Sequence, residues 1–218
     1  MCGIVATIGS REAAPLLLQG LQRLEYRGYD SAGLATVTPG QLHCCKAEGK
    51  LAYLRKRLEK NPVAGYCGIG HTRWATHGKP DVRNAHPQVD EADQVAVVQN
   101  GIIENHRLLR QRLEHQGVPF RSDTDTEVIP HLVAMALADL RGTVPPADLL
   151  RLAVAQAVQQ LEGAYALAVI WLGQPEELVG VRYNAPLLVG RGEGQFFCAS
   201  DTPALAGVAS SIVSLEDG

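Results

Sequence analysis

The chain alternates between short apolar runs and longer segments in which apolar residues recur at every third or fourth position. The short runs predict strands, and several are apolar almost throughout, which is typical of strands covered on both faces. They span 3–8, 33–37, 66–71, 95–98, 165–171, 178–182, 187–190 and 195–200, and a further strand-like segment surrounds Cys44-Cys45. The periodic segments predict helices near 11–24, 50–60, 104–116, 125–141 and 147–162.

The order of these elements is mixed rather than a regular alternation of strand and helix, so it predicts an α+β fold. Strands covered on both faces, with enough helices for two outer layers, favour a four-layer αββα sandwich. Thr124 and Glu127 have the spacing of a capping box, which predicts the start of the fourth helix. Glycines alternate over 190–194 with no helix after them, so we expect a hairpin there and no phosphate-binding loop.

Composition and charge narrow the class of protein. The 218 residues are 46% hydrophobic and 20% charged, with a formal net charge of −3. These values exclude a disordered or fibrous chain, and they offer no basic surface for nucleic acid or for an acidic membrane. No linker, repeat or low-complexity tract divides the chain, so we expect one domain over 1–218.

No segment has the character of a membrane anchor or an export signal. The longest apolar run, 164–172, has nine residues, whereas a helix that spans a bilayer needs about 20. No basic residue precedes the first apolar stretch, so we expect no secretory signal. The five cysteines are an odd number without C-x-x-C spacing, which favours reduced thiols and a soluble, cytoplasmic protein.

Cys2 differs from the other four cysteines because only Met1 precedes it. Removal of Met1 would leave Cys2 with a free α-amine, whose pKa is about 7.7–8.0. One residue would then carry both a nucleophile and a base suited to neutral pH. On its own, however, Cys2 is more simply interpreted as a small residue at the start of an edge strand.

A polar loop, 70–78, follows an apolar strand and contains Arg73 and Trp74. Because a guanidinium can bind a carboxylate at two points, the loop is a candidate small-molecule site, with a purely structural loop as the alternative. The spacings of the candidate metal ligands match no common zinc pattern, so we expect no metal. Those candidates are Cys67, His71, His77 and His86.

Asn100-Gly101 follows an apolar strand and could form an ordinary turn into the next helix. It could also form an oxyanion hole, with a side-chain N–H from Asn100 and a backbone N–H from Gly101 that no Cβ obstructs. Two further polar features also have structural alternatives. The glycine-bounded loop 26–33 could be only a connection, and the carboxylate of Asp125 could only favour the start of its own helix.

The segments that could carry chemistry are Cys2-Gly3-Ile4-Val5, 26–33, 71–78, Asn100-Gly101 and Thr124-Asp125-Thr126-Glu127. In this order and spacing they resemble the N-terminal-nucleophile glutamine amidotransferases, from Cys2 to about Asp201. The resemblance is closest to the glutaminase domain of the glutamine–fructose-6-phosphate aminotransferases (isomerising). Tyr29 and Trp74 carry this narrower resemblance, since the amidophosphoribosyltransferase relatives usually have Gln and Tyr at those positions.

The resemblance implies the N-terminal-nucleophile hydrolase type of αββα sandwich, with two mostly antiparallel sheets. It implies that Cys2 attacks the side-chain amide of L-glutamine while its α-amine moves the proton, giving glutamate and ammonia without a cofactor. Asn100 and Gly101 are expected to hold the oxyanion. Arg73 is expected to bind the substrate carboxylate, and Asp125 to accept from the substrate ammonium. The other pocket residues implied are Arg27, Trp74, Thr76, His77 and His86.

Gln99 departs from the family, because many members have histidine before Asn-Gly. Members of the family continue into a sugar-phosphate isomerase domain, so the resemblance implies that fructose 6-phosphate is used only through a domain absent from this chain. It also implies a homo-oligomeric full-length protein. Two alternatives stay open: an amide hydrolase with another substrate, and a non-catalytic module that retains the fold. Arg73 together with Asp125 argues against the first, since an apolar acyl group needs no pair of opposite charges.

Overall fold

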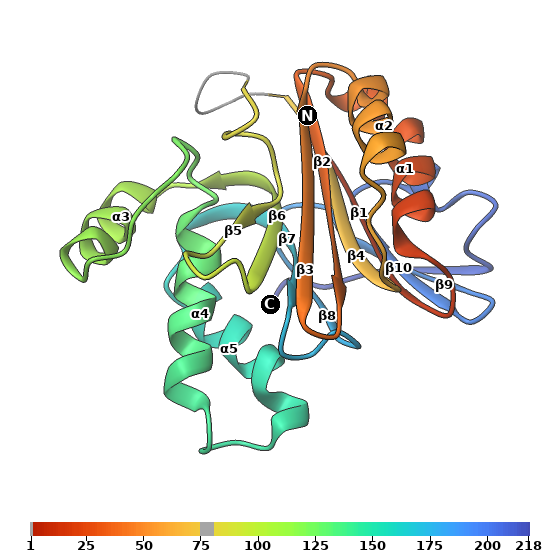
Figure 1. Ribbon diagram of the computed structural model, residues 1–218. Coiled ribbons are helices and arrows are strands. Elements are labelled where there is room, and N and C mark those ends of the chain that lie inside the picture. The colour runs from red at the N-terminus through yellow and green to blue at the C-terminus, as the bar shows by residue number, and fades with distance from the viewer. Residues whose placement is uncertain (1, 75–80) are drawn as a thin grey trace.

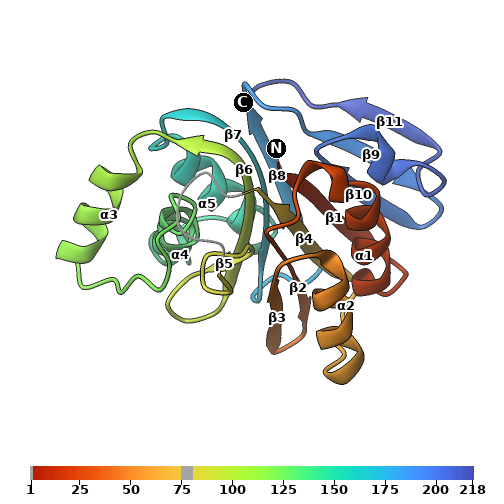
Figure 2. The ribbon, with the colours of Figure 1, turned by 90° about the horizontal axis from the view of Figure 1, so that it is seen from above.

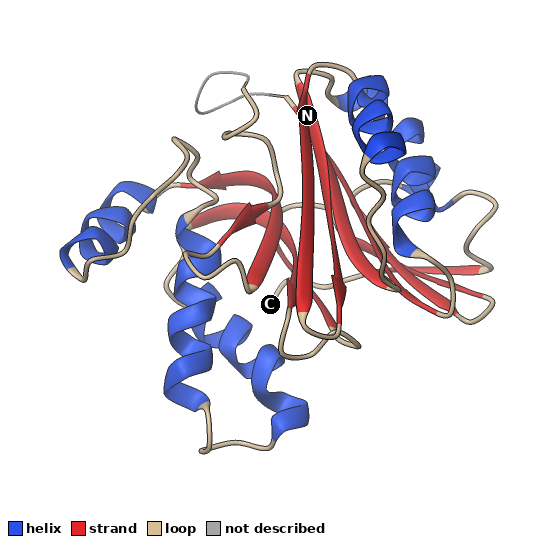
Figure 3. Ribbon diagram, in the orientation of Figure 1, coloured by secondary structure: helices blue, strands red, loops and turns tan. Residues whose placement is uncertain are grey.

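The computed structural model describes residues 2–74 and 81–218. Two antiparallel sheets face each other in the middle of the molecule, and helices cover the outer face of each (Figure 1, Figure 3). The α+β class and the four-layer αββα sandwich predicted from the sequence are therefore confirmed.

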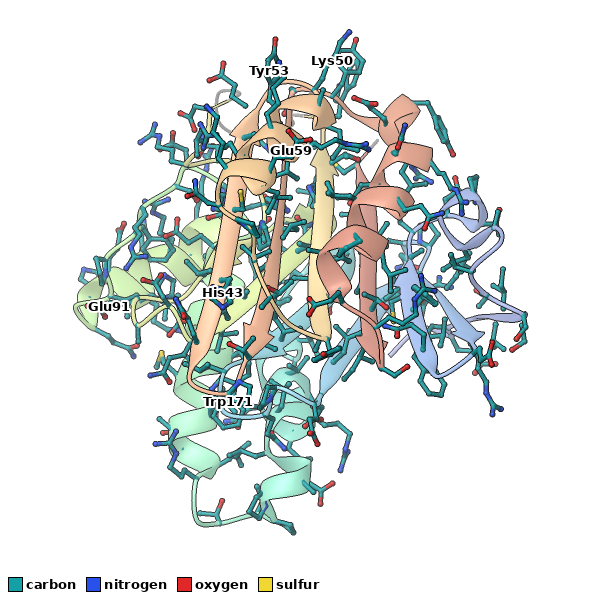
Figure 4. All side chains as sticks on the ribbon, turned by 45° about the vertical axis from the view of Figure 1, so that its right-hand side comes forward. His43, Lys50, Tyr53, Glu59, Glu91 and Trp171 are labelled. Atoms are coloured by element: carbon teal, nitrogen blue, oxygen red, sulfur yellow. The ribbon has the colours of Figure 1, made fainter. Side chains whose placement is uncertain are left out.

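The larger sheet has seven strands in the order β11-β9-β10-β1-β4-β2-β3. Its strands are β1 (Gly3–Gly9), β2 (Ser31–Thr38), β3 (Gln41–Glu48), β4 (Cys67–Arg73), β9 (Leu188–Gly192), β10 (Gln195–Ala199) and β11 (Ser211–Ser214). Its outer face is covered by α1 (Ala13–Arg23) and α2 (Leu51–Lys60), with the short turns η1 (Glu25–Arg27) and η3 (Thr202–Leu205) beside them. Leu54 of α2 is buried against the sheet, whereas Lys50 and Tyr53 project outward (Figure 4).

The smaller sheet has four strands in the order β5-β6-β7-β8. They are β5 (Gln88–Val89), β6 (Val95–Ile103), β7 (Gly163–Trp171) and β8 (Leu178–Tyr183). Helices α4 (Val128–Leu140) and α5 (Leu149–Val158) cover its outer face, with η2 (Pro146–Asp148) leading into α5. Helix α3 (His106–His115) extends to the side of α4, as the view from above shows (Figure 2).

Successive side chains of a strand point to opposite faces of its sheet, and here both faces are covered. In β1, Ile4 packs into the layer between the sheets, whereas Val5 packs toward α1. In β6, Val98 packs between the sheets and Val97 packs toward α4 and α5. Burial of both faces explains why these strands are apolar almost throughout.

The fourth helix begins at Val128 and not near 125, so the predicted capping box is wrong. The Glu127 carboxylate accepts hydrogen bonds from the backbone N–H groups of Arg121 and Ser122, each at 2.6 Å, and from the Ser122 hydroxyl. The hydroxyl groups of Thr124 and Ser122 lie 2.8 Å apart. These bonds fold 121–127 into a compact loop ahead of α4, because local polar groups satisfy the backbone before the helix can start.

The strand predicted at 95–98 continues as β6 to Ile103, so Asn100-Gly101 does not form a turn. Both residues are paired with β7, Asn100 opposite Ala166 and Gly101 opposite Tyr165. The sheet therefore holds the Asn-Gly pair rigidly, which a connecting turn would not do.

The hairpin predicted over 190–194 is confirmed by the pairing of β9 with β10. Strands β5 and β11 were not predicted, since β5 has two residues and β11 is exposed along its length. Among the helices of the described ranges, none combines the length and the apolar content needed to cross a membrane.

Candidate active site

The predicted catalytic residues meet at one end of the layer between the sheets. Cys2 directly precedes β1, Arg73 ends β4, and Asn100 lies in the last part of β6. Along their strands, Cys2, Arg73 and Asn100 are an even number of positions from Ile4, Ile69 and Val98, which pack between the sheets. Side chains an even number of positions apart share a face of the strand, so all three side chains face the opposite sheet. The described residues that line the cavity there are Cys2, Arg73, Trp74, His86, Gln99, Gly101, Thr124 and Asp125.

The Cys2 thiol lies against the main chain of Trp74. The backbone N–H of Trp74 points at Sγ from 3.3 Å, and Sγ lies 3.5 Å from the carbonyl oxygen of the same residue. Burial raises the pKa of the thiol, although the Trp74 backbone and the nearby Arg73 act in the opposite direction. The thiol is therefore protonated at neutral pH, so it could react as a nucleophile only with the help of a base.

Asn100 and Gly101, predicted to form an oxyanion hole, both lie close to Cys2. Nδ2 of Asn100 donates to the carbonyl oxygen of Cys2 at 3.1 Å. Gly101 has φ of +113°, a region that L side chains rarely adopt, and a Cβ there would collide with the carbonyl oxygen of Ala164 in β7. Only glycine fits at this position, so its backbone N–H is free of side-chain obstruction.

A cation and an anion line the same cavity. Arg73 and Asp125 are each only 4% exposed, so both charges act in surroundings poor in water. Oδ2 of Asp125 accepts from the backbone N–H of Ile103 at 2.8 Å, which fixes the carboxylate against the end of β6. The cavity therefore suits a ligand that carries both an acidic and a basic group.

Trp74 stands at the mouth of the cavity. It is 48% exposed, and its ring meets that of Tyr29 edge to face, with centroids 5.5 Å apart. The adjoining residues Thr76 and His77, which the sequence also predicts in the pocket, lie outside the described residues.

Arg27, predicted as a pocket residue, is not among the described residues that line the cavity. Its guanidinium pairs with Asp201 at 2.6 Å, and the Tyr26 hydroxyl donates to the same carboxylate oxygen at 2.8 Å. The loop packs against the main chain of the site, where the backbone N–H of Asp30 donates to the carbonyl oxygen of Arg73 at 3.2 Å. A Cβ at Gly28 would lie 2.7 Å from the carbonyl group of Arg73, so the loop supports the main chain that contacts Cys2.

Sequence reasoning did not foresee a closed set of hydrogen bonds behind the cavity wall. The Gln99 N–H donates to Nδ1 of His86 at 3.3 Å, Nε2 of His86 lies 3.2 Å from Oγ1 of Thr126, and Thr126 donates to Oε1 of Gln99 at 2.8 Å. Nδ1 accepts, so Nε2 carries the proton of a neutral His86 and donates to Thr126. Gln99, unusual for the resembled family, thus links β6 to the loop before α4. No signal in one sequence could show this contact, because the three residues are far apart along the chain.

The unfolding free energy is expected to fall steeply between pH 7 and pH 5. The rings of His71 and His86 stack with centroids 4.3 Å apart, and both side chains are buried. Burial, together with Arg73, lowers the pKa of His71 to about 3, and burial, His71 and Arg73 lower the pKa of His86 well below its ordinary value. The folded protein leaves both rings neutral while the unfolded chain protonates them below about pH 6.5. Stability is thus fully present above that pH and is lost as the pH falls.

Each histidine accounts for a loss of about 2 kcal/mol over this range. Urea titrations at pH 7, 6 and 5 measure the loss, and His71→Gln removes the share of one imidazole. A stability that stays level to pH 5, or a His71→Gln protein with the wild-type slope, would contradict the assignment.

Within 2–74 and 81–218, no group of three or more histidine, cysteine, aspartate or glutamate side chains is placed to hold a metal ion. The five cysteines form no disulfide. The described groups at or beside the cavity are the Cys2 thiol, the charges of Arg73 and Asp125, and the N–H groups of Asn100 and Gly101.

The chain is similar to known glutamine amidotransferases in sequence. The glutamine amidotransferase domain family matches residues 71–207. The glutamine–fructose-6-phosphate aminotransferases (isomerizing) of Thermosynechococcus vestitus and Aquifex aeolicus are 56% and 50% identical to the chain over 218 residues. These alignments cover 100% of this chain but 34% and 35% of the two relatives. The chain thus spans about a third of the length of the curated relatives it matches.

A solved structure also shares the fold. The glutamine phosphoribosylpyrophosphate amidotransferase from B. subtilis, in complex with ADP and GMP, superposes with a TM-score of 0.83 and 27% sequence identity. The match covers 100% of this chain and 46% of that chain. The chain therefore shares its fold, over its whole length, with a solved amidotransferase.

Proposed function

Because the chain belongs to the glutamine amidotransferase domain family, we propose that its cavity binds L-glutamine and that Cys2 cleaves the side-chain amide. The observation that carries the proposal is the joint presence of the Cys2 thiol, Arg73 and Asp125 in one cavity. Glutamine has the two charges that such a cavity can bind and an amide that a thiol can attack.

In the proposed complex the fixed charges orient the substrate. Arg73 binds the α-carboxylate through its two-pronged guanidinium, and Asp125 accepts from the α-ammonium. His86 and Trp74 line the same cavity. The family resemblance assigns Thr76 and His77, which lie outside the described residues, to the glutamine pocket as well. Arg27 serves the site indirectly by holding its loop to Asp201. With both ends of the amino-acid moiety held, the amide carbon is presented to Sγ of Cys2.

The proposed reaction then proceeds through a thioester. The α-amine of Cys2, exposed by removal of Met1, takes the thiol proton as Sγ forms a bond to the amide carbon. The resulting oxyanion accepts from Nδ2 of Asn100 and the N–H of Gly101. The protonated α-amine of Cys2 then passes its proton to the leaving nitrogen, and the C–N bond of the amide breaks to release ammonia. Water hydrolyses the thioester, which gives glutamate and restores the thiol.

We propose that the ammonia is used by a separate acceptor domain. The relatives named above are glutamine–fructose-6-phosphate aminotransferases, and two thirds of their length lies outside the match. On this analogy the acceptor is fructose 6-phosphate and the product is glucosamine 6-phosphate. We also propose that the full-length protein is a cytoplasmic homo-oligomer. Residues 1–218 form the glutaminase domain, and no sugar-phosphate site is proposed within them.

The test is hydrolysis by residues 2–218, prepared with Met1 removed. Glutamine should yield equal amounts of glutamate and ammonia, and fructose 6-phosphate should be neither consumed nor stimulatory. Two analogues probe the charges: glutaramate lacks the ammonium, and 4-aminobutanamide lacks the carboxylate. Each should lose about ten- to a hundredfold in kcat/KM, since a charge-assisted hydrogen bond contributes about 1.5–3 kcal/mol.

Asparagine is the matched control for the length of the substrate, because it keeps both charges and its side chain is one methylene shorter than that of glutamine. Absence of glutamate formation would refute the proposed function. Equal rates with glutaramate or 4-aminobutanamide would refute the charge clamp and favour an amide hydrolase of another specificity.

A further inference from the structure

His71 is buried behind the proposed oxyanion hole and has no role in the reaction described so far. It lies in β4, is fully buried, and is not among the described residues that line the cavity. Its Nε2 atom lies 3.1 Å from Oδ1 of Asn100. A polar ring buried in this position, in contact with the residue expected to stabilise the oxyanion, calls for a physical explanation.

The orientation of the Asn100 amide follows from the groups around it. A backbone carbonyl oxygen can only accept a hydrogen bond, so the amide atom 3.1 Å from the Cys2 carbonyl has to be the donor Nδ2. The other atom, Oδ1, then faces His71 and can only accept. Nε2 of His71 is therefore the donor, and this argument does not depend on how oxygen and nitrogen of the amide were told apart.

The surroundings of His71 favour the required neutral ring. Burial and the guanidinium of Arg73 lower the pKa of His71 to about 3, although the contact with Asn100 and the backbone of Gln99 act in the opposite direction, and the ring of His86 stacks on it. Among the described residues Nδ1 of His71 has no hydrogen-bond partner, so Nε2 is the ring nitrogen that faces an acceptor. A neutral imidazole carries one proton, so the proton on Nε2 fixes the tautomer. The donor is thus the same at neutral pH as at mildly acidic pH.

We propose that His71 is a positioning residue, which holds the amide of Asn100 with Nδ2 toward the nucleophile through an Nε2–H···Oδ1 hydrogen bond. The inference rests on the proposed function, since it concerns the same oxyanion hole. A flipped Asn100 would set Nδ2 against the His71 donor and Oδ1 against the Cys2 carbonyl. Both contacts would be repulsive, and an oxygen would then face the developing oxyanion.

The proposal predicts a particular pattern of kinetic loss. His71→Leu removes the donor and should lower kcat for glutamine by about tenfold to a hundredfold, less than or equal to the loss of a whole oxyanion donor. KM should change less than about threefold, because Arg73 and Asp125 stay in place. His71→Gln places an amide N–H near the position of Nε2 and should restore most of kcat.

A double-mutant cycle separates positioning from general support of the fold. If His71 acts through Asn100, then His71→Leu should add less than about twofold to the loss caused by Asn100→Ala. The matched control is Ile69→Ala, two residues earlier on the same face of β4 and fully buried. Its effect on kcat should be small, and it should combine multiplicatively with Asn100→Ala. Circular dichroism and urea titration confirm that each variant is folded.

Nitrogen NMR of the wild-type ring provides a measurement that needs no folded variant. The proposal requires a neutral His71 with its proton on Nε2, and a proton on Nδ1 would overturn it. Equal kcat for His71→Leu and wild type, or independent effects of His71→Leu and Asn100→Ala, would overturn it as well. These failures differ from failure of the proposed function, in which the wild-type protein would not hydrolyse glutamine at all.

Discussion

Substitution of Cys2 by alanine is expected to abolish glutamine hydrolysis, with a loss of about 10⁴-fold or more in kcat. Sγ is the only thiol among the described residues that line the cavity, so no other group there can form the thioester. The fold should be unchanged, because the side chain is half-buried and contacts the main chain of Trp74. Glutamate release measures activity, and circular dichroism with urea unfolding measures the fold.

Two comparisons make the result specific. Cys44→Ala removes an exposed thiol from β3, away from the cavity, and should leave kcat and KM unchanged. Insertion of one residue between Met1 and Cys2 keeps the thiol but turns its amine into an amide, so activity should also be lost. Turnover by Cys2→Ala above about one hundredth of the wild-type rate would show that Cys2 is not the nucleophile.

The sequence predicts the layers of this fold because the strands are apolar on both faces. Val97 and Val98 face different layers in β6, and this double burial appears directly as an uninterrupted apolar run. The end of that strand was not predicted correctly, because β6 continues to Ile103. Asn100-Gly101 is typical of a turn, and only the pairing with β7 keeps the two residues in the sheet. Tertiary pairing overrides local preference there.

The site was predictable as a set of residues but not as a set of contacts. The candidate segments are separated by tens of residues, and their order and spacing identify the family without giving any distance. Arg27 shows that such contacts cannot be predicted from spacing, since its partner Asp201 lies 174 residues further along the chain. His71 and Gln99 do so as well, because tautomers and side-chain orientations depend on atoms that only the fold brings together.

The other large effect is expected for Gly101→Ala, which should lower kcat by about 10²–10³-fold. Gly101 combines φ of +113° with close contact to β7, where a Cβ would collide with the Ala164 carbonyl and lie 3.0 Å from Cα of Tyr165. Both obstacles are backbone, so β6 itself has to move. Its displacement carries away the Gly101 N–H and Nδ2 of Asn100, the two proposed oxyanion donors. Strain and lost pairing should also cost about 2 kcal/mol or more of stability.

Gly117→Ala is the matched control for this prediction. Gly117 also has a positive φ, +87°, but no atom lies within 4 Å of the position of its Cβ. The control therefore introduces a similar backbone strain without displacing a strand, and should lower stability by about 1 kcal/mol while kcat stays unchanged.

Gly101→Ala should in addition raise KM, because the N–H of Ile103, two residues further along β6, holds the Asp125 carboxylate. A Gly101→Ala protein with wild-type kcat would show that the N–H at this position does not stabilise the oxyanion.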